Sequence, residues 1–245
     1  SIMGVINLTP DSFSDGGDLN STKEVLNQVN HFLRNGVDVI DLGAQSTRPG
    51  ANEVGSSIEI KRLIPYLKII KSEYPEILIS IDTFNSEVAY EALINGADWI
   101  NDVTGGRRDN EILDVVSKFN CPFVITHSRG NSKNMNELSK YEDVLSEVKS
   151  SLEILIKNAL EKNISKNNII VDPGIGFSKD INQNLEILKN LDVFKNLNFP
   201  ILIGASRKRF IGEILNQENP KERDIGTLAI SCLCSHFNID IVRVH

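Results

Sequence analysis

Acidic side chains close several short apolar runs of this sequence, at the positions where strands would end. Asp41 ends VDVID, Asp82 ends ILISID and Asp172 ends NIIVD. A buried carboxylate costs several kcal/mol unless it is paired, or else it gives up its charge, so we expect a ligand or a cation beside Asp82 and Asp102, at neighbouring strand ends. Asp41 has a simpler interpretation, in which it bonds backbone groups at the exit of its strand.

Amides and a histidine close three more of these runs. Asn7 ends IMGVIN, Asn101 and Asp102 end ADWIND, and His127 ends PFVITH. Taken alone, His127 is interpreted as a satisfied core residue rather than a base. The carboxylate and amide oxygens accept hydrogen bonds, so this set fits a flat heterocycle that carries several N–H groups.

Cations gather at the ends of the last two apolar runs. The segment SRKRF places Ser206 and three cations, Lys208 among them, directly after a strand, where they can meet anionic oxygens. A solvated basic start of a helix is the alternative. Arg243 and His245 alternate with Val244, so their side chains share one face of the final strand. Acceptors on some strands and cations on others predict a nitrogen heterocycle with an anionic tail.

Two long loops follow the first two runs and add polar and aromatic residues. NLTPDSFSDGG contains Phe13 and Asp15, and QSTRPGA contains Thr47, Arg48 and Pro49. Long, turn-rich loops after barrel strands are candidates for lids that close over substrate and exclude water. A plain surface excursion is the alternative for either loop.

The elements that must position these residues form a regular alternation. Segments with apolar residues at three- and four-residue intervals separate the apolar runs and predict amphipathic helices, one of them starting at Ser21 with the capping-box spacing to Glu24. Helices that cover buried parallel strands favour an α/β fold, a closed (β/α)8 TIM barrel whose strand ends meet at one rim; a doubly wound open sheet is the alternative. The eight runs lie at 2–7, 37–43, 77–83, 97–103, 122–127, 168–174, 200–206 and 239–245.

Length and composition limit the classes of protein to which this chain can belong. The 245 residues fit one domain, 1–245, that begins inside the first strand and is trimmed before the eighth helix. A net charge of −7 argues against a duplex-binding protein, and no stretch reaches the length of a membrane span. Cys121, Cys232 and Cys234 form no C-x-x-C pair, which indicates buried thiols in a reducing compartment. With no signal peptide in view, we expect a cytoplasmic protein.

Seven segments, in order and spacing, resemble the signature segments of the dihydropteroate synthase family, from the first residue of the chain to the last. They are NLTPDSFSDGG, QSTRPGA, ISIDT, INDVTGG, VDPGIGFSK, GASRKRFIG and IVRVH. The resemblance implies a (β/α)8 barrel of folate synthesis, a family that sulfonamides target. It also implies a transferase reaction, which joins 6-hydroxymethyl-7,8-dihydropterin diphosphate to 4-aminobenzoate and gives 7,8-dihydropteroate and diphosphate.

The resemblance also implies roles for individual residues. Asp15, Arg48, Asp172 and Lys208 would be catalytic, and Asn7 would ligate Mg²⁺, the implied cofactor. The pterin would contact Asp82, Asn101, Asp172 and Lys208. The diphosphate would contact Asn7, Thr47, Arg243 and His245. The 4-aminobenzoate would contact Phe13, Thr47, Arg48, Pro49, Phe177 and Ser206.

Partners and alternatives follow from the same resemblance. Members of the family form homodimers through their last helices, and multifunctional members fuse this domain to neighbouring folate enzymes. A pterin-binding methyltetrahydrofolate methyltransferase shares the pterin-ring residues but needs no grip on a diphosphate, so the STRPG, SRK and RVH segments argue against it. A catalytically silent pterin-binding protein would have lost lid or diphosphate residues, and Asn7, Arg48 and Arg243 are present.

Overall fold

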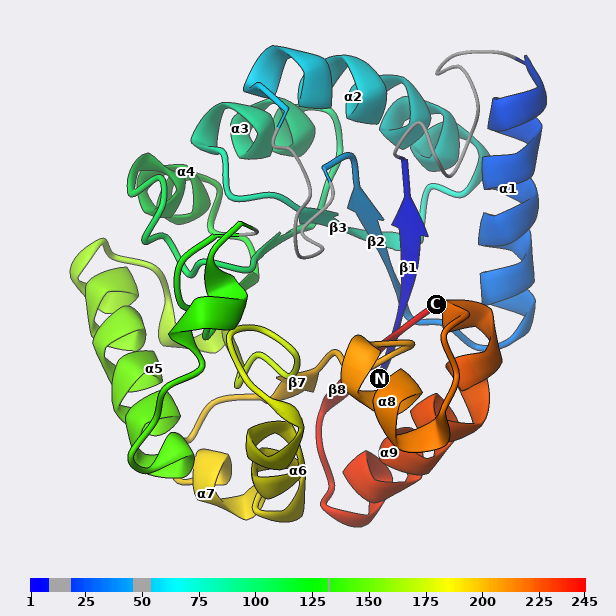
Figure 1. Cartoon of the computed structure of the whole chain (residues 1–245). Coiled ribbons are helices and arrows are strands. Elements are labelled where there is room, and N and C mark those ends of the chain that lie inside the picture. The colour runs from blue at the N-terminus through cyan, green and yellow to red at the C-terminus, as the bar shows by residue number, and fades with distance from the viewer. Residues whose placement is uncertain (9–18, 46–53, 132) are drawn as a thin grey trace.

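A ring of eight parallel strands with helices outside it forms the molecule, seen along the barrel in Figure 1. The computed structural model describes residues 1–8, 19–45, 54–131 and 133–245. The strand order is β6-β5-β4-β3-β2-β1-β8-β7, so β1 pairs with both β2 and β8. A parallel bridge between Val171 and Ile201 joins the remaining edges, where the Val171 amide donates to the Pro200 carbonyl at 2.9 Å. The prediction of a closed (β/α)8 barrel is confirmed, and the open sheet is excluded.

The strands lie inside the apolar runs that the sequence predicts, and each is shorter than its run or equal to it. Their bounds are β1 Ile2–Asn7, β2 Val39–Gly43, β3 Leu78–Asp82, β4 Trp99–Asp102, β5 Phe123–Thr126, β6 Ile169–Asp172, β7 Leu202–Ile203 and β8 Ile241–Val244. Most end at or next to the polar residue that closes the run. The polar residues therefore sit at the carboxyl ends of the strands, where active sites of such barrels form.

The helices follow the strands as the amphipathic segments predict, with one difference at the first. Helix α1 begins at Leu19, two residues before Ser21, so Ser21 is not its first residue. The complete capping box lies instead at Asp180 and Gln183, at the start of α6. The helices are α1 Leu19–Arg34, α2 Ser56–Glu73, α3 Ser86–Ile94, α4 Glu111–Phe119, α5 Val144–Glu161, α6 Ile181–Lys189, α7 Asp192–Lys195, α8 Arg209–Leu215 and α9 Asp224–His236, with short 3-10 helices at Met135–Leu138, Lys166–Asn168 and Pro220–Arg223.

Two apolar layers hold the barrel together. Strand residues that point outward, such as Ile40 and Leu42 of β2, join one core with Leu63 and Leu67 of α2, and all four are fully buried. Burial of each such side chain stabilises the fold by about 1.5–3 kcal/mol. Inward-pointing residues of six strands form a second, smaller cluster that fills the barrel: Met3, Val39, Val124, Ile170, Leu202 and Ile241. That cluster is the floor on which the polar residues of the next layer stand.

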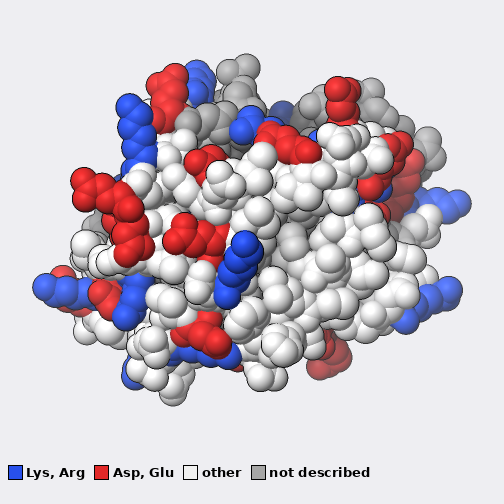
Figure 2. Space-filling model, turned by 60° about the horizontal axis from the view of Figure 1, so that its bottom comes forward, with Lys and Arg blue, Asp and Glu red and all other residues white. Residues whose placement is uncertain are grey.

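Acidic and basic side chains are interspersed on the outer surface seen in Figure 2, which carries no broad field of one sign. An uncharged area covers much of its right half, the side on which Figure 1 has α9. Ile225 and Leu228 of α9 are 67% and 57% exposed. Among the described residues, no helix has both the length and the apolar character that a membrane crossing requires.

Candidate active site

A layer of polar side chains lies directly above the apolar floor because strand residues two apart point to the same side of the sheet. Two positions after the floor residues Val39, Ile170 and Ile241 come Asp41, Asp172 and Arg243. Trp99 packs against the floor, and Asn101 follows it by the same spacing. Four strands thus bring two carboxylates, an amide and a guanidinium to one level inside the barrel.

Arg243 of β8 lies at the centre of this layer and holds two carboxylates. Its Nε donates to Asp41 Oδ2 at 2.7 Å, and one of its terminal nitrogens donates to Asp82 Oδ2 at 2.8 Å. Asn101 Nδ2 donates to the same Asp41 oxygen at 3.1 Å. Burial by itself would lower the pKa of Arg243, but Asp41 and Asp82 outweigh it and raise the pKa above its ordinary value. Arg243 is therefore a permanent cation in the pocket.

Asp82 of β3 is a carboxylate whose negative charge is costly to bury. Burial raises its pKa to about 7, Arg243 opposes that rise, and the nearby charges of Asp41 and Glu59 add to it. Its second oxygen, Oδ1, is buried, and no described residue bonds it. An acceptor in this state gains most from a ligand that supplies an N–H group.

Asp172 ends β6 at the barrel mouth, where burial raises its pKa and the charge of Lys208 acts to lower it. Its Oδ1 accepts from the Gly174 amide at 2.7 Å. Burial raises the pKa of Asp172, whereas Lys208, the Gly174 amide and Lys179 lower it. Gly204 of the β7 exit keeps this space open, because a Cβ there would lie 3.9 Å from Asp172 Oδ2 and 3.8 Å from Arg243 Cδ.

Lys208 follows β7 and points into the same mouth. Its Nζ donates to the Ile175 carbonyl and lies 4.3 Å from the centre of the Phe177 ring, a cation–π distance. Burial lowers the pKa of Lys208 to about 8, and Asp172 opposes the shift. The side chain passes close to Gly176, where a Cβ would meet Lys208 Cδ at 2.7 Å.

Three further predicted residues complete the described part of the rim. The Nδ1 of His245 lies 3.0 Å from Ser206 Oγ, and the His245 amide donates to the same oxygen at 3.2 Å. Asn7 ends β1 beside β2, with its Oδ1 3.9 Å from the place of a Cβ on Gly43, and the same place is 3.8 Å from Asp82 Oδ2. Asn7 and Asp82 therefore both lie beside Gly43, while Ser206 and His245 form their own pair.

The structure also separates residues that the sequence groups together. Asp102 directly follows Asn101 and so points the opposite way. Its carboxylate accepts from the amides of Thr104 at 2.7 Å and Gly106 at 2.6 Å, which makes it an anchor for a turn. Phe13, Asp15, Thr47, Arg48 and Pro49 lie outside the described residues.

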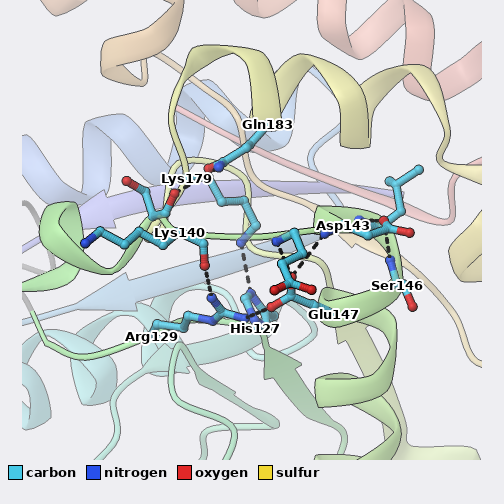
Figure 3. A network of polar contacts seen from close by, with 11 residues as sticks. His127, Arg129, Lys140, Asp143, Ser146, Glu147, Lys179 and Gln183 are labelled. Atoms are coloured by element: carbon cyan, nitrogen blue, oxygen red, sulfur yellow. Dashed lines mark hydrogen bonds and ion pairs between the residues drawn. The ribbon is translucent and has the colours of Figure 1, made fainter.

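Two residues near the pocket were not assigned to it from the sequence. Asp41 was interpreted as a backbone anchor, yet it pairs with Arg243 and Asn101. Lys179 donates from Nζ to His127 Nδ1 at 2.9 Å, and the two side chains point toward each other in Figure 3. The alternation of side chains along a strand could have placed Asp41 in the pocket, because Asp41 points to the same side of β2 as Val39 and Gly43. Lys179 is the last residue of the VDPGIGFSK segment, but the resemblance gave it no role.

The site offers little to a metal ion by itself. Within the described ranges, no three His, Cys, Asp or Glu side chains are grouped so that they could hold one. Asn7 does have an amide oxygen at the carboxyl end of β1, beside Gly43. An oxygen of this kind suits Mg²⁺, which often takes one or two protein ligands together with phosphate and water.

Comparison with known proteins gives information that does not depend on the geometry of the site. The model of the family described as pterin binding enzyme matches residues 3–245. A dihydropteroate synthase from Synechocystis sp. is 43% identical over all of this chain and 84% of its own length. A folate synthesis bifunctional protein from Arabidopsis thaliana is also 43% identical, and there the chain spans only 53% of the relative.

Solved structures that resemble this chain belong to the same kind of enzyme as its relatives in sequence. A dihydropteroate synthase from Clostridium difficile, crystallised in the presence of pteroic acid, has a TM-score of 0.93 at 42% identity, with 100% of this chain and 90% of that chain covered. One from Xanthomonas albilineans in complex with 7,8-dihydropteroate has a TM-score of 0.88 at 33% identity, covering 100% and 87%.

Proposed function

The chain belongs to the pterin binding enzyme family, as a dihydropteroate synthase, and from this premise we propose how its residues carry out the reaction. The enzyme is a transferase of folate synthesis. It condenses 6-hydroxymethyl-7,8-dihydropterin diphosphate with 4-aminobenzoate and gives 7,8-dihydropteroate and diphosphate. Residues 1–245 act as one pterin-binding domain.

The observation that carries the assignment of residues is the meeting of acceptors and cations above one apolar floor. Asp82, Asn101 and Asp172 bind the N–H groups along the edge of the pterin. The free Oδ1 of Asp82 supports this role, since it is a buried acceptor without a described partner. Lys208 adds a charged donor at the same ring, at a distance from Asp172 where each shifts the pKa of the other.

The diphosphate is bound at the β8 side of the mouth. A guanidinium has five N–H groups, and Asp41 and Asp82 engage two of those on Arg243. The others can donate to phosphate oxygens. His245 and Asn7 lie on the same rim, and Thr47 of the second loop joins them in our proposal.

Mg²⁺ fits this arrangement as an ion held mainly by the diphosphate. Asn7 would supply one amide oxygen, with phosphate oxygens and water as its other ligands. When bound, the ion neutralises negative charge on the leaving group. Asn7 would thereby also fix the end of the tail relative to the ring.

The chemical step breaks the C–O bond between the pterin methylene and the diphosphate and forms a C–N bond to the aryl amine, which then loses a proton. Arg243 and His245 stabilise the departing anion. The Asp172 carboxylate stabilises the positive charge that develops on the pterin. The amine needs no strong base, because it is already a free nucleophile at neutral pH.

The 4-aminobenzoate lies against the Phe177 ring, near Ser206 and Lys208. The support for this place is the stacking of Lys208 on Phe177, 4.3 Å from Nζ to ring centre, which puts an apolar face and a cation side by side. A benzoate needs both. Phe13, Asp15, Thr47, Arg48 and Pro49 complete the pocket from the two loops in this proposal.

The proposal also covers how the protein assembles and where in the cell it acts. The exposed Ile225 and Leu228 of α9 support a homodimer in which a second copy covers this helix. The relative named as a bifunctional folate synthesis protein supports fusion of the domain to other folate enzymes. The cytoplasmic location stays a prediction.

The test is an assay of diphosphate release from the pterin diphosphate, run with and without 4-aminobenzoate and Mg²⁺. We expect release that depends on all three components, with 7,8-dihydropteroate formed in equal amount. Absence of release under these conditions, with a folded protein, would refute the reaction. Release that persists after Lys208→Ala would refute the site.

A further inference from the structure

Lys179 is a buried lysine just outside the pocket, between β6 and the Asp180 cap of α6. Its side chain is 8% exposed and runs toward the end of β5, as Figure 3 shows. Nζ donates to His127 Nδ1 at 2.9 Å, to the Gly174 carbonyl at 2.9 Å and to the Phe177 carbonyl at 3.0 Å. An ammonium has three N–H donors, and here each has one acceptor.

This position is costly for a charged group. Burial lowers the pKa of Lys179 well below its ordinary value; Lys208, Arg129 and Arg107 add to that, and Asp172 opposes it. A leucine or methionine would fill the same space without that cost. The three directed hydrogen bonds, rather than packing, therefore distinguish a lysine here.

The anchored carbonyls belong to the segment 174–177, which supports the pterin end of the site. The Gly174 amide donates to Asp172 Oδ1 at 2.7 Å. The Ile175 carbonyl accepts from Lys208, and the Phe177 ring lies under the same ammonium. Lys179 holds the first and last residues of this segment, so its hydrogen bonds fix the backbone that both Asp172 and Lys208 contact.

We propose that Lys179 is a positioning residue of the reaction, which orients Asp172 and Lys208 through the segment 174–177. The inference rests on the function proposed above and extends it by one residue that does not touch substrate. His127 takes part as the neutral acceptor that orients the ammonium from the β5 side.

The charge of Lys179 gives this role a signature in the pH dependence. Lys208, Lys179, Arg243 and the Gly174 amide face Asp172 and oppose the rise that burial causes in its pKa. Loss of Lys179 removes one cation and loosens the Gly174 amide, so the pKa of Asp172 rises further. Asp172 then takes up its proton at higher pH, and activity is lost at higher pH on the acid side. Burial and the neighbouring Lys179 lower the pKa of His127 to about 2, so His127 does not titrate in this range.

The test compares Lys179→Met with Lys189→Met, a matched change on the exposed end of α6. The readouts are thermal unfolding, kcat and KM for each substrate, and the pH profile of kcat/KM. We expect at least a tenfold loss of kcat/KM for Lys179→Met, with its acid limb moved to higher pH, and wild-type values for Lys189→Met. A folded Lys179→Met with the wild-type pH profile would make Lys179 merely structural and overturn the proposal.

Two variants of His127 decide the question if Lys179→Met does not fold. His127→Asn keeps an acceptor at the δ position, and His127→Leu removes it. We expect His127→Leu to shift the acid limb in the same direction and His127→Asn to retain most of the activity. Equal profiles for both would overturn the proposal. The wild-type protein in the same assay tests the proposed function by itself, because the reaction is observed there whichever role Lys179 has.

Discussion

Substitution of Gly176 by alanine should displace the side chain of Lys208 and so reduce turnover, although Lys208 itself is not mutated. Gly176 has φ +80°, and a Cβ there would lie 2.7 Å from Lys208 Cδ and 3.6 Å from Lys208 Cε. The lysine chain must withdraw, and Nζ then leaves the Ile175 carbonyl and the Phe177 ring. A hydrogen bond to a charged group contributes about 1.5–3 kcal/mol, so kcat/KM should fall by roughly 10- to 150-fold.

Gly36 supplies the matched control for the backbone. It has φ +76°, and a Cβ on it would meet nothing within 4 Å. Alanine in this left-handed region costs about 1–2 kcal/mol at either glycine, which lowers Tm by roughly 2–8 °C in a chain of this size. Gly36→Ala should therefore lose only this backbone contribution in a thermal melt, whereas Gly176→Ala should lose it together with the displaced Lys208 contacts, and only Gly176→Ala should lose turnover in the diphosphate release assay. Equal kcat/KM in the two variants would show that Lys208 does not depend on this close approach.

Three further predictions concern the carboxylates of the pocket. Asp82→Asn should weaken pterin binding by about 1.5–3 kcal/mol in calorimetry, and unchanged affinity would make Asp82 structural. Burial raises the pKa of Asp82 from 3.8 to about 7, so the folded protein binds this proton more tightly than the unfolded chain; ligand-free stability should fall as pH rises from about 4 to 7, and Asp82→Asn should flatten that fall in urea unfolding at several pH values. Asp41→Ala should cost about 3–5 kcal/mol in the same urea experiment, because it leaves the guanidinium of Arg243 with one of its two buried carboxylate partners; a cost below 1 kcal/mol would mean that Asp82 alone satisfies it.

Local pattern was sufficient for the barrel and for most of the polar layer. The apolar runs predicted the strands, and the two-residue alternation placed Arg243 toward the barrel mouth, where it pairs with Asp41. The same alternation places the side chains of Asn101 and Asp102 on opposite faces of β4. This difference is missed when the two residues are treated as one pair. Asp102 faces away from the pocket and anchors the turn at Thr104 and Gly106.

Pairings between distant strands were beyond the sequence. Asp41 and Arg243 are 202 positions apart, and only the closure of the ring between β1 and β8 brings them together. Lys179 follows a loop whose backbone no periodicity describes, so its hydrogen bonds could not be inferred. The start of α1 at Leu19 shows the same limit at short range, because a capping-box spacing at Ser21 is a weak signal when tertiary packing sets where a helix begins.

In our proposal, charge balance inside the ligand-free barrel links recognition of the ring to recognition of the tail. Arg243 is balanced by Asp41 and Asp82, so a phosphate that also accepts from Arg243 would weaken the pairing of the buried Asp82 carboxylate. The N–H groups of a pterin would supply further donors to the same carboxylate. A diphosphate without the ring would leave Asp82 with the weakened pairing alone. By this argument the ring offsets a cost that the tail imposes, and Arg243 couples recognition of the two halves.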